Sequence, residues 1–244
     1  ELINDESVNI VVELMGGEHP ALELILAAVK NGKHVVTANK EVISKHGADI
    51  FSLARENNVR VLFEASVGGG IPIISPLMRD LVANDIKSIK AIINGTTNYI
   101  LTRMANEQAD YQQMLQEAQK LGYAESDPTN DVEGVDAAYK LSILSTLAFR
   151  ASVKNTDIYT EGITNLTDKD FLYAKELGYS IKLLAIATRT GSSVLGRVHP
   201  ALIPEDQMLA KVDDALNAVE VETDLVDKVL FHGPGAGSMP TTSA

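Results

Sequence analysis

The first 65 residues alternate between short apolar runs and longer segments with helical spacing. Residues 8–15 (VNIVVELM) are apolar and β-branched, which predicts a strand buried on both faces. Residues 34–38 and 59–65 predict two further strands, and apolar positions recur with helical spacing over 19–31 and 40–57. Strand, helix, strand, helix and strand in this order indicate right-handed crossovers and a parallel sheet.

Three polar or glycine-containing turns follow the ends of these predicted strands. They contain Gly16-Gly17, Asn39-Lys40 and residues 66–70. Parallel sheets bind ligands beyond the carboxyl ends of their strands, so we expect the three turns on one rim. A plain loop is the alternative for any single turn, whereas three on one rim favour a binding site. The segment looks like half of a doubly wound nucleotide-binding domain. No GxGxxG follows a strand near the start, so the sequence is expected to begin in the middle of such a domain.

A glycine-rich connection, residues 66–76 (SVGGGIPIISP), leads out of this region. Its glycines allow backbone conformations that other residues disfavour, and Pro72 suits the first turn of a helix. The carbonyls of such a loop could hold a monovalent cation, and the helix start could face a negatively charged group. A flexible domain hinge explains the same spacing equally well.

The region from 85 to 222 predicts a second layer, a sheet with helices packed on it. Strands are expected over 85–93, 180–188, 193–200 and 217–222, with a hairpin at 189–192, and a further strand is expected beyond this region over 228–231. Helices are expected over 98–106, 110–121 and 167–177. Thr96 or Thr97 is the expected cap of the first of these helices, and substrate contact is the alternative role. The closing GPGAGSMPTTSA indicates a glycine turn that opens a helix, or else a disordered tail.

The most informative stretch is 121–147, where an acidic loop leads into a long helix. The loop carries Glu125, Asp127, Asp131 and Glu133, and the helix begins near Gly134. Asp136 and Lys140 are four residues apart, so the carboxylate and the ammonium can meet on one face. Beyond Lys140 the helix is mostly apolar and should enter a core. Such a pair can position a small polar substrate and transfer a proton. A solvated salt bridge is the alternative, because exposed pairs at this spacing are common and weak.

The composition narrows the classes of partner. The 244 residues carry a net charge of −12 and contain no basic run, which argues against nucleic acid and against an anionic membrane surface. The absence of cysteine excludes disulfides and thiolate chemistry and fits a cytoplasmic protein. The five histidines are scattered without ligand spacing, so a transition-metal site is not expected.

Five motifs together strongly resemble homoserine dehydrogenase, and they cover nearly the whole chain. They are TANK (37–40), EASVGGGIPII (64–74), NGTTNYIL (94–101), LGYAESDPTNDVEGVDAAYKLSIL (121–144) and GPGAG (233–237). The resemblance implies interconversion of L-aspartate 4-semialdehyde and L-homoserine with NAD or NADP, in threonine and methionine biosynthesis. It also implies a homodimer or homotetramer. The alternatives are another NAD(P)-linked oxidoreductase of a small amino-acid aldehyde, or a non-catalytic dimerisation module.

The resemblance also implies how the chain is divided. The expected fold class is α/β: a partial doubly wound nucleotide-binding domain plus an α+β catalytic and dimerisation domain with a mixed sheet covered by helices. We expect the first domain over 1–66, the second over 67–222, and a return to the nucleotide-binding domain over 223–244. The family's N-terminal dinucleotide fingerprint and its C-terminal end are not in this sequence. The chain alone is therefore expected to bind NAD(P) weakly, and its own activity is left open.

Carried over position by position, the resemblance assigns roles to residues of this chain. It makes Lys140 the proton donor to the aldehyde oxygen, Asp136 its positioning partner and a substrate contact, and Lys40 a second candidate in proton transfer. The expected substrate-binding residues are Glu125, Asp131, Asp136 and Thr96. The expected cofactor contacts are Gly16, Lys40, Gly122, Gly235 and Gly237. The backbone oxygens of Glu64, Val67, Gly69 and Ile71 match a sodium-type cation site.

Overall fold

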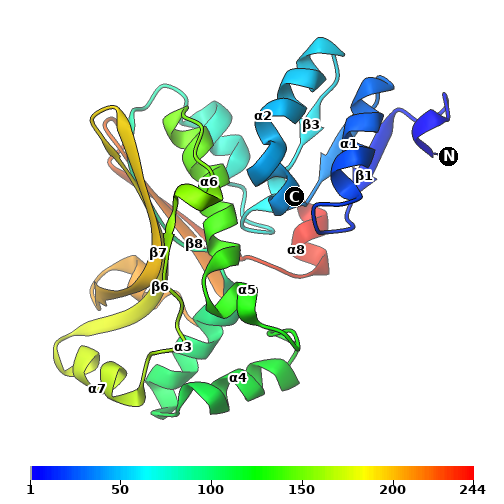
Figure 1. The fold of residues 1–244 in the computed structure, drawn as a ribbon. Coiled ribbons are helices and arrows are strands. Elements are labelled where there is room, and N and C mark those ends of the chain that lie inside the picture. Colours follow the sequence, from blue (N-terminus) through cyan, green and yellow to red (C-terminus); the bar gives the residue numbers. More distant parts are fainter. Residues whose placement is uncertain (1) are drawn as a thin grey trace.

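The computed structural model describes residues 2–244 and contains two sheets joined by a pair of chain crossings (Figure 1). The smaller sheet holds three parallel strands in the order β1 (Ile10–Glu13), β2 (His34–Thr37) and β3 (Val61–Leu62). Helices α1 (Ala21–Lys30) and α2 (Lys40–Glu56) connect the strands. The parallel strand-helix pattern predicted for the first 65 residues is therefore confirmed.

Strand β1 is less buried than its apolar sequence predicts. It pairs only with β2, at the edge of the sheet, and Val11 packs against the core formed with α1 and α2. Ile10 and Val12 are 56% and 60% exposed. The expectation of a strand covered on both faces is wrong for residues 2–244, because a run of β-branched residues does not reveal whether a second layer covers it.

The larger sheet has six strands in the order β5-β7-β6-β4-β8-β9. All neighbours are antiparallel except the short parallel pair β5-β7, so the predicted mixed sheet is confirmed. The strands are β4 (Ile86–Ile92), β5 (Tyr159–Thr160), β6 (Tyr179–Thr190), β7 (Ser193–Pro204), β8 (Leu216–Thr223) and β9 (Lys228–Pro234). Because β9 pairs with β8, the chain turns back toward the smaller sheet only after Pro234, later than the expected residue 223.

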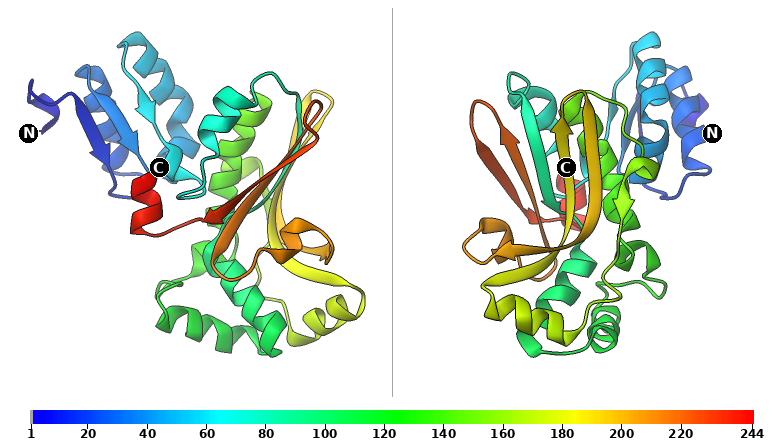
Figure 2. Two further views of the ribbon diagram at one scale, coloured as in Figure 1. Left: turned by 180° about the vertical axis from the view of Figure 1, so that it is seen from behind. Right: turned by 60° about the vertical axis from the view of Figure 1, so that its left-hand side comes forward.

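Helices cover one face of this sheet and project below it (Figure 2). They are α3 (Gly95–Glu107), α4 (Tyr111–Lys120), α5 (Thr129–Val132), α6 (Val135–Phe149) and α7 (Asp168–Glu176). Helix α8 (Ser238–Ser243) follows β9 and lies beside the smaller sheet (Figure 1). Short 3-10 turns span Leu2–Asn4, Glu64–Ser66, Asn155–Asp157 and Met208–Lys211, and a π-helix spans Pro76–Asp80. Apolar residues of α6, such as Leu141 and Leu144, are fully buried in the largest core, as the sequence predicts. No helix within 2–244 is long and apolar enough to span a membrane.

The cap of α3 differs from the expected one. The side chain of Asn94, not of Thr96 or Thr97, accepts the hydrogen bond from the backbone N–H of Thr97. Asn, Ser, Thr and Asp all serve as N-caps, so the sequence NGTT leaves the capping residue ambiguous. The predicted cap Asp110 of α4 is confirmed, because its carboxylate accepts from the Gln113 N–H.

The two crossings between the sheets lie against each other. The backbone N–H of Gly70, on the first crossing, donates to the carbonyl of Pro234, at the start of the second. Gly69 has a positive φ of 53°, and a Cβ there would collide with the carbonyl of Gly235. Helix α2 also packs on α6, so the smaller sheet is held beside α6. This arrangement brings the start of α2 beside the start of α6.

Candidate active site

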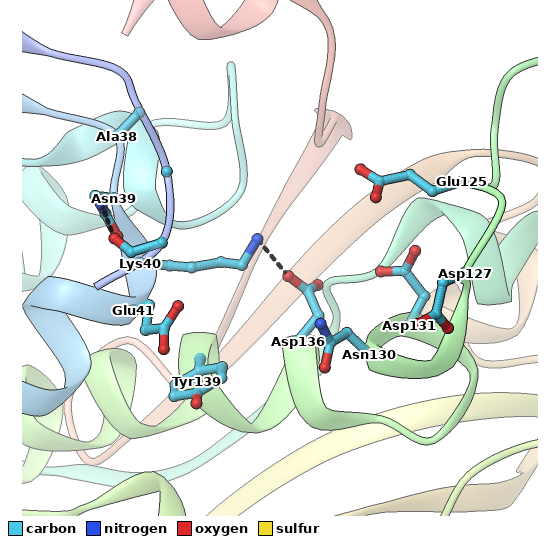
Figure 3. A pocket seen from close by; sticks show the side chains of 12 residues that line it. Ala38, Asn39, Lys40, Glu41, Glu125, Asp127, Asn130, Asp131, Asp136 and Tyr139 are labelled. Atoms are coloured by element: carbon cyan, nitrogen blue, oxygen red, sulfur yellow. Dashed lines mark hydrogen bonds and ion pairs between the residues drawn. The ribbon is translucent and has the colours of Figure 1, made fainter. Parts of the chain in front are cut away.

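A pocket of about 380 Å³ lies between the smaller sheet and the start of α6. Figure 3 shows its side chains converging from both parts of the chain. The wall on one side comes from the β1-α1 turn and the start of α2, and the other from the acidic loop, α5 and α6. The lining residues are Gly16, Gly17, Ala38, Asn39, Lys40, Glu41, Glu125, Asp127, Asn130, Asp131, Asp136 and Tyr139.

Asp136 lies between two lysines at the base of this pocket. Its Oδ2 is 2.7 Å from Lys140 Nζ, one helical turn further along α6. Its Oδ1 is 2.9 Å from Lys40 Nζ, in the first turn of α2. The Asp136 side chain is only 5% exposed, so this is a buried charge with two partners and not a solvated salt bridge. The predicted meeting of Asp136 and Lys140 is confirmed.

Local sequence places each of these side chains. Asn39 caps α2 by accepting from the Val42 N–H, and its amide donates to the carbonyl of Gly17, 2.7 Å away. Lys40 thereby emerges at the first helical position, beside the β1-α1 turn. Gly134 precedes α6 with a φ of +79°, a conformation that suits glycine, and starts the helix just before Asp136.

The electrostatics favour the ionised forms of Asp136 and Lys40. Burial alone would raise the pKa of the Asp136 carboxyl, but the ammoniums of Lys140 and Lys40 hold that pKa well below its ordinary value. Burial likewise would lower the pKa of Lys40, yet the Asp136 carboxylate outweighs it and raises that pKa above 10.5. Lys140 also donates to the carbonyl of Ile93 at 2.8 Å, so two of its three N–H groups are fixed by the protein.

Two further carboxylates line the same pocket. Asp131 is half-buried, and its Oδ1 accepts from Asn94 Nδ2 at 2.7 Å. Burial raises the pKa of Asp131, and the charge of Asp136 adds to that rise. Glu125 is exposed on the loop, and its carboxylate lies across the pocket from the Lys40 ammonium (Figure 3). The pocket lining thus carries clustered negative charge and the Lys40 ammonium. Lys140 is not among the lining residues and is linked to the pocket through Asp136.

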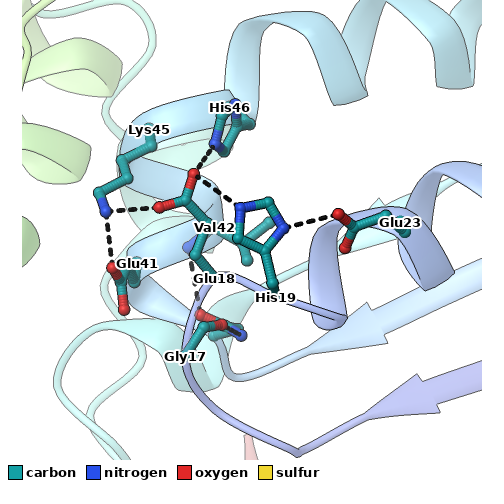
Figure 4. Close-up of polar contacts among 9 residues, drawn as sticks. Gly17, Glu18, His19, Glu23, Glu41, Val42, Lys45 and His46 are labelled. Carbon is teal, nitrogen blue, oxygen red and sulfur yellow. Dashed lines mark hydrogen bonds and ion pairs between the residues drawn. The ribbon is translucent and has the colours of Figure 1, made fainter.

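A charged clamp holds the glycine turn that forms the pocket wall (Figure 4). Glu18, directly after Gly17, accepts from Lys45 Nζ and from His46 Nε2, each at 2.7 Å, and both partners lie on α2. These hydrogen bonds lower the pKa of Glu18 to about 2. Lys45 also bonds Glu41, a pocket residue, at 2.6 Å. Glu18, Lys45 and His46 therefore tie the β1-α1 turn to α2.

The other sequence-predicted residues lie at different places. Gly16 lines the pocket, whereas Gly122, Gly235 and Gly237 do not. Gly122 is an exposed residue after α4, and Gly237 precedes α8. Thr96 is buried, lies outside the pocket lining and donates its hydroxyl to the carbonyl of Tyr123 at 2.5 Å.

The predicted cation loop carries three carbonyls without a partner. Val67, Gly69 and Ile71 are buried, and within residues 2–244 their carbonyl oxygens accept no hydrogen bond. Buried carbonyls normally have a partner, so three bare ones on one loop fit an oxygen-ligated cation. The Glu64 side chain serves elsewhere, because its carboxylate accepts the N–H groups of Ile73, Ile74 and Ser75.

Several pocket residues were not singled out from the sequence. Glu41, Asn130 and Tyr139 line the pocket, and Asn94 bonds two of its carboxylates. The four-residue spacing on this helix pointed to the face that carries Lys140, and it did not single out its neighbour Tyr139. Asn94 carried a usable signal, since an asparagine ahead of a helix is a strong N-cap candidate.

Comparisons with known proteins agree along the whole chain. Residues 72–244 match the family model described as homoserine dehydrogenase, and residues 1–64 match the model for its NAD binding domain. The homoserine dehydrogenase of Neisseria gonorrhoeae is 51% identical over 100% of this chain and 56% of that protein. The chain thus spans little more than half the length of this curated relative.

Solved structures give the same result. The crystal structure of a homoserine dehydrogenase from Thiobacillus denitrificans has a TM-score of 0.97 at 53% identity, covering 99% of this chain and 56% of that one. A hyperthermophilic archaeal homoserine dehydrogenase in complex with NADPH has a TM-score of 0.86 at 30% identity, covering 99% of this chain and 70% of that one.

Proposed function

Because the chain belongs to the homoserine dehydrogenase family, we propose that the pocket around Asp136 is where L-aspartate 4-semialdehyde and L-homoserine are interconverted. The observation that carries this proposal is the buried Asp136 carboxylate held between the ammoniums of Lys40 and Lys140. A scaffold has little use for such a cluster, since burying the Asp136 carboxylate and most of Lys140 is costly unless they serve a further purpose.

Reduction of the aldehyde needs a hydride at carbon and a proton at oxygen. When bound, the nicotinamide supplies the hydride. Negative charge then develops on the aldehyde oxygen, and an ammonium within hydrogen-bond reach stabilises it and supplies the proton. Lys140 is the proposed donor: Asp136 and the Ile93 carbonyl fix its position and leave one N–H free for the substrate.

Lys40 is the second proposed participant in proton transfer. Its side chain is 43% exposed and lines the pocket next to the β1-α1 turn, where a nicotinamide would enter. In the reverse direction the alcohol proton returns to a lysine while the hydride leaves carbon. Asp136 keeps both amines oriented by binding each with a different oxygen.

The remaining carboxylates suit the other end of the substrate. Glu125 is proposed to bind the substrate's ammonium group, with Asp131 beside it. A small amino-acid aldehyde has an ammonium and a carbonyl oxygen a few bonds apart, and in the pocket the Glu125 carboxylate lies across from the Lys40 ammonium (Figure 3). Thr96 is the weakest of the proposed substrate contacts, since its hydroxyl is already engaged by Tyr123.

The cofactor is proposed to bind at the rim of the smaller sheet, where Gly16 leaves open space for it. Gly122, Gly235 and Gly237 are proposed to meet it from the other segments. The archaeal relative solved with NADPH supports a nicotinamide cofactor, NAD or NADP.

The bare carbonyls of Val67, Gly69 and Ile71 support a sodium ion nearby, together with the Glu64 carbonyl. The division into parts at residue 66, with the return to the nucleotide-binding part after Pro234, and a dimeric or tetrameric assembly belong to the same proposal.

The test follows NADPH absorbance with aspartate semialdehyde, using the whole natural protein that carries this sequence. The variants are Lys140→Ala and, as the matched control, Lys120→Ala on the outer helix α4. We expect kcat to fall at least 100-fold in the first and to stay unchanged in the second, since a positioned acid contributes about that factor. Unchanged turnover in Lys140→Ala would remove this lysine from the mechanism. Repeating the assay with choline in place of sodium tests the cation.

A further inference from the structure

Asn94 connects two carboxylates that should repel each other. Its Nδ2 donates to Asp131 Oδ1 at 2.7 Å and to Asp136 Oδ2 at 2.9 Å, so both amide hydrogens are used. Its Oδ1 accepts from the Thr97 N–H at 2.9 Å and the Thr97 hydroxyl at 3.0 Å. The side chain is 5% exposed. Thr97 thus fixes which end of the amide faces the acids.

We propose that Asn94 is a positioning residue of the active site, which sets the orientation of Asp136 and holds Asp131 beside it as an ionised pair. This inference deepens the proposed function and rests on it. Asn94 and Lys140 both bond Asp136 Oδ2. The carboxylate is therefore held in one orientation, and Oδ1 is left to face Lys40 across the pocket. Without the amide, either oxygen could bind either lysine.

The same amide also offsets the repulsion between the two acids. Asp131 is close enough to Asp136 for the two charges to act on each other, and Asn94 puts its N–H groups between them. The other charged groups that face this cluster are Lys40 on α2, Lys140 on α6 and Glu125 on the loop. Two carboxylates and a substrate ammonium can then share a site without one acid taking up a proton.

Asparagine is the one residue of this shape that can do both tasks. Aspartate, serine and asparagine all cap helices, so each keeps an acceptor for the Thr97 N–H at the start of α3. Only the amide also offers two donors. Asn94→Asp keeps the shape and the cap but places a third carboxylate against Asp131 and Asp136. Asn94→Ser keeps the cap and adds no charge.

The experiment compares steady-state kinetics of the wild-type protein, Asn94→Asp and Asn94→Ser between pH 5.5 and 9, with thermal unfolding as a check on folding. In Asn94→Asp we expect kcat/KM for the substrate to fall about 10- to 100-fold at pH 8, the usual effect of losing a charged hydrogen bond. The loss should shrink as the pH falls, because the introduced carboxyl regains one O–H donor once it is protonated. Asn94→Ser should lose less and should keep the wild-type pH profile.

Two results would overturn the proposal. One is a wild-type pH profile and kcat/KM in Asn94→Asp. The other is an equal, pH-independent loss in both variants, which is what a purely structural cap would give. A carbon-13 NMR titration of the aspartate carboxyls separates this proposal from the proposed function. Asn94→Asp should raise the pKa of Asp131 even if the wild-type protein does not turn over aspartate semialdehyde.

Discussion

Lys40 Nζ, at the start of α2, lies 2.9 Å from Asp136 Oδ1, at the start of α6. The first residue belongs to the smaller sheet's layer and the second to the helices on the larger sheet. The pocket is therefore complete only while the two parts stay together. The paired crossings at Gly69 and Gly235 and the packing of α2 on α6 keep them so.

Replacing the shared carboxylate should remove the support of both lysines at once. In Asp136→Asn we expect kcat/KM to fall by about 100-fold or more, because a neutral amide cannot orient two ammoniums. Breaking a buried charge pair also costs up to about 3–5 kcal/mol of unfolding free energy. The control Asp127→Asn removes a carboxylate from the same pocket rim, whose hydrogen bonds within the described part of the chain go to Thr129. A comparable loss in both variants would mean that total charge, not the lysine contacts, matters.

The loss of folding stability at low pH should depend on Asp136. Its folded-state pKa lies below the ordinary 3.8, so the carboxylate contributes stability that is complete above pH 3.8. That contribution is lost as the pH falls through the lower folded value. The melting temperature of Asp136→Asn should therefore change less than that of the wild-type protein between pH 5 and pH 2. Parallel curves for the two proteins would contradict this assignment.

The contribution of Asp131 to folding stability should depend on pH in the opposite direction. Its folded-state pKa is raised, so the protonated form is favoured by folding. The resulting contribution is complete below pH 3.8 and is lost as the pH rises through the folded value. Asp131→Asn should thus gain stability relative to the wild-type protein as the pH goes from 3 to 7. Urea unfolding at several pH values measures it, and a difference that is constant with pH would count against it.

The sequence could reveal contacts between residues that are close along the chain, but not contacts that depend on how distant elements pack. The Asp136–Lys140 pair follows from helical spacing alone. The approach of Lys40 to Asp136 does not, because it depends on how α2 packs on α6, and only the family resemblance pointed to it. The amide of Asn94 was missed because Thr96 and Thr97 can cap the same helix, although asparagine ranks above threonine as an N-cap. The exposure of β1 was missed because an apolar run in the sequence does not show whether another layer of the fold covers that strand.

The clamp on the glycine turn should affect the cofactor more than the fold. Glu18 is tied to Lys45 and His46 of α2, directly beside Gly17 in the pocket wall. In Glu18→Gln the turn loses its charged partners, and we expect KM for NADPH to rise about two- to fivefold, the size of a lost surface pair. The matched control is Glu23→Gln, whose carboxylate pairs within residues 2–244 with the exposed His19. The proposal fails if the two variants have the same KM.

The second crossing between the sheets has no room for a side chain at Gly235. A Cβ there would collide with the buried side chain of Asn217, whereas at Gly233 it would lie 3.5 Å from Ile71. Neither glycine has a positive φ, so the pair isolates crowding from backbone strain. We expect Gly235→Ala to lower the free energy of unfolding by about 1–3 kcal/mol, as overpacking does. Gly233→Ala should change it little. Because the same crossing holds Lys40 beside Asp136, kcat should fall in Gly235→Ala at temperatures where the protein is still folded. Loss of stability with full activity would mean that the crossing supports the fold and not the site.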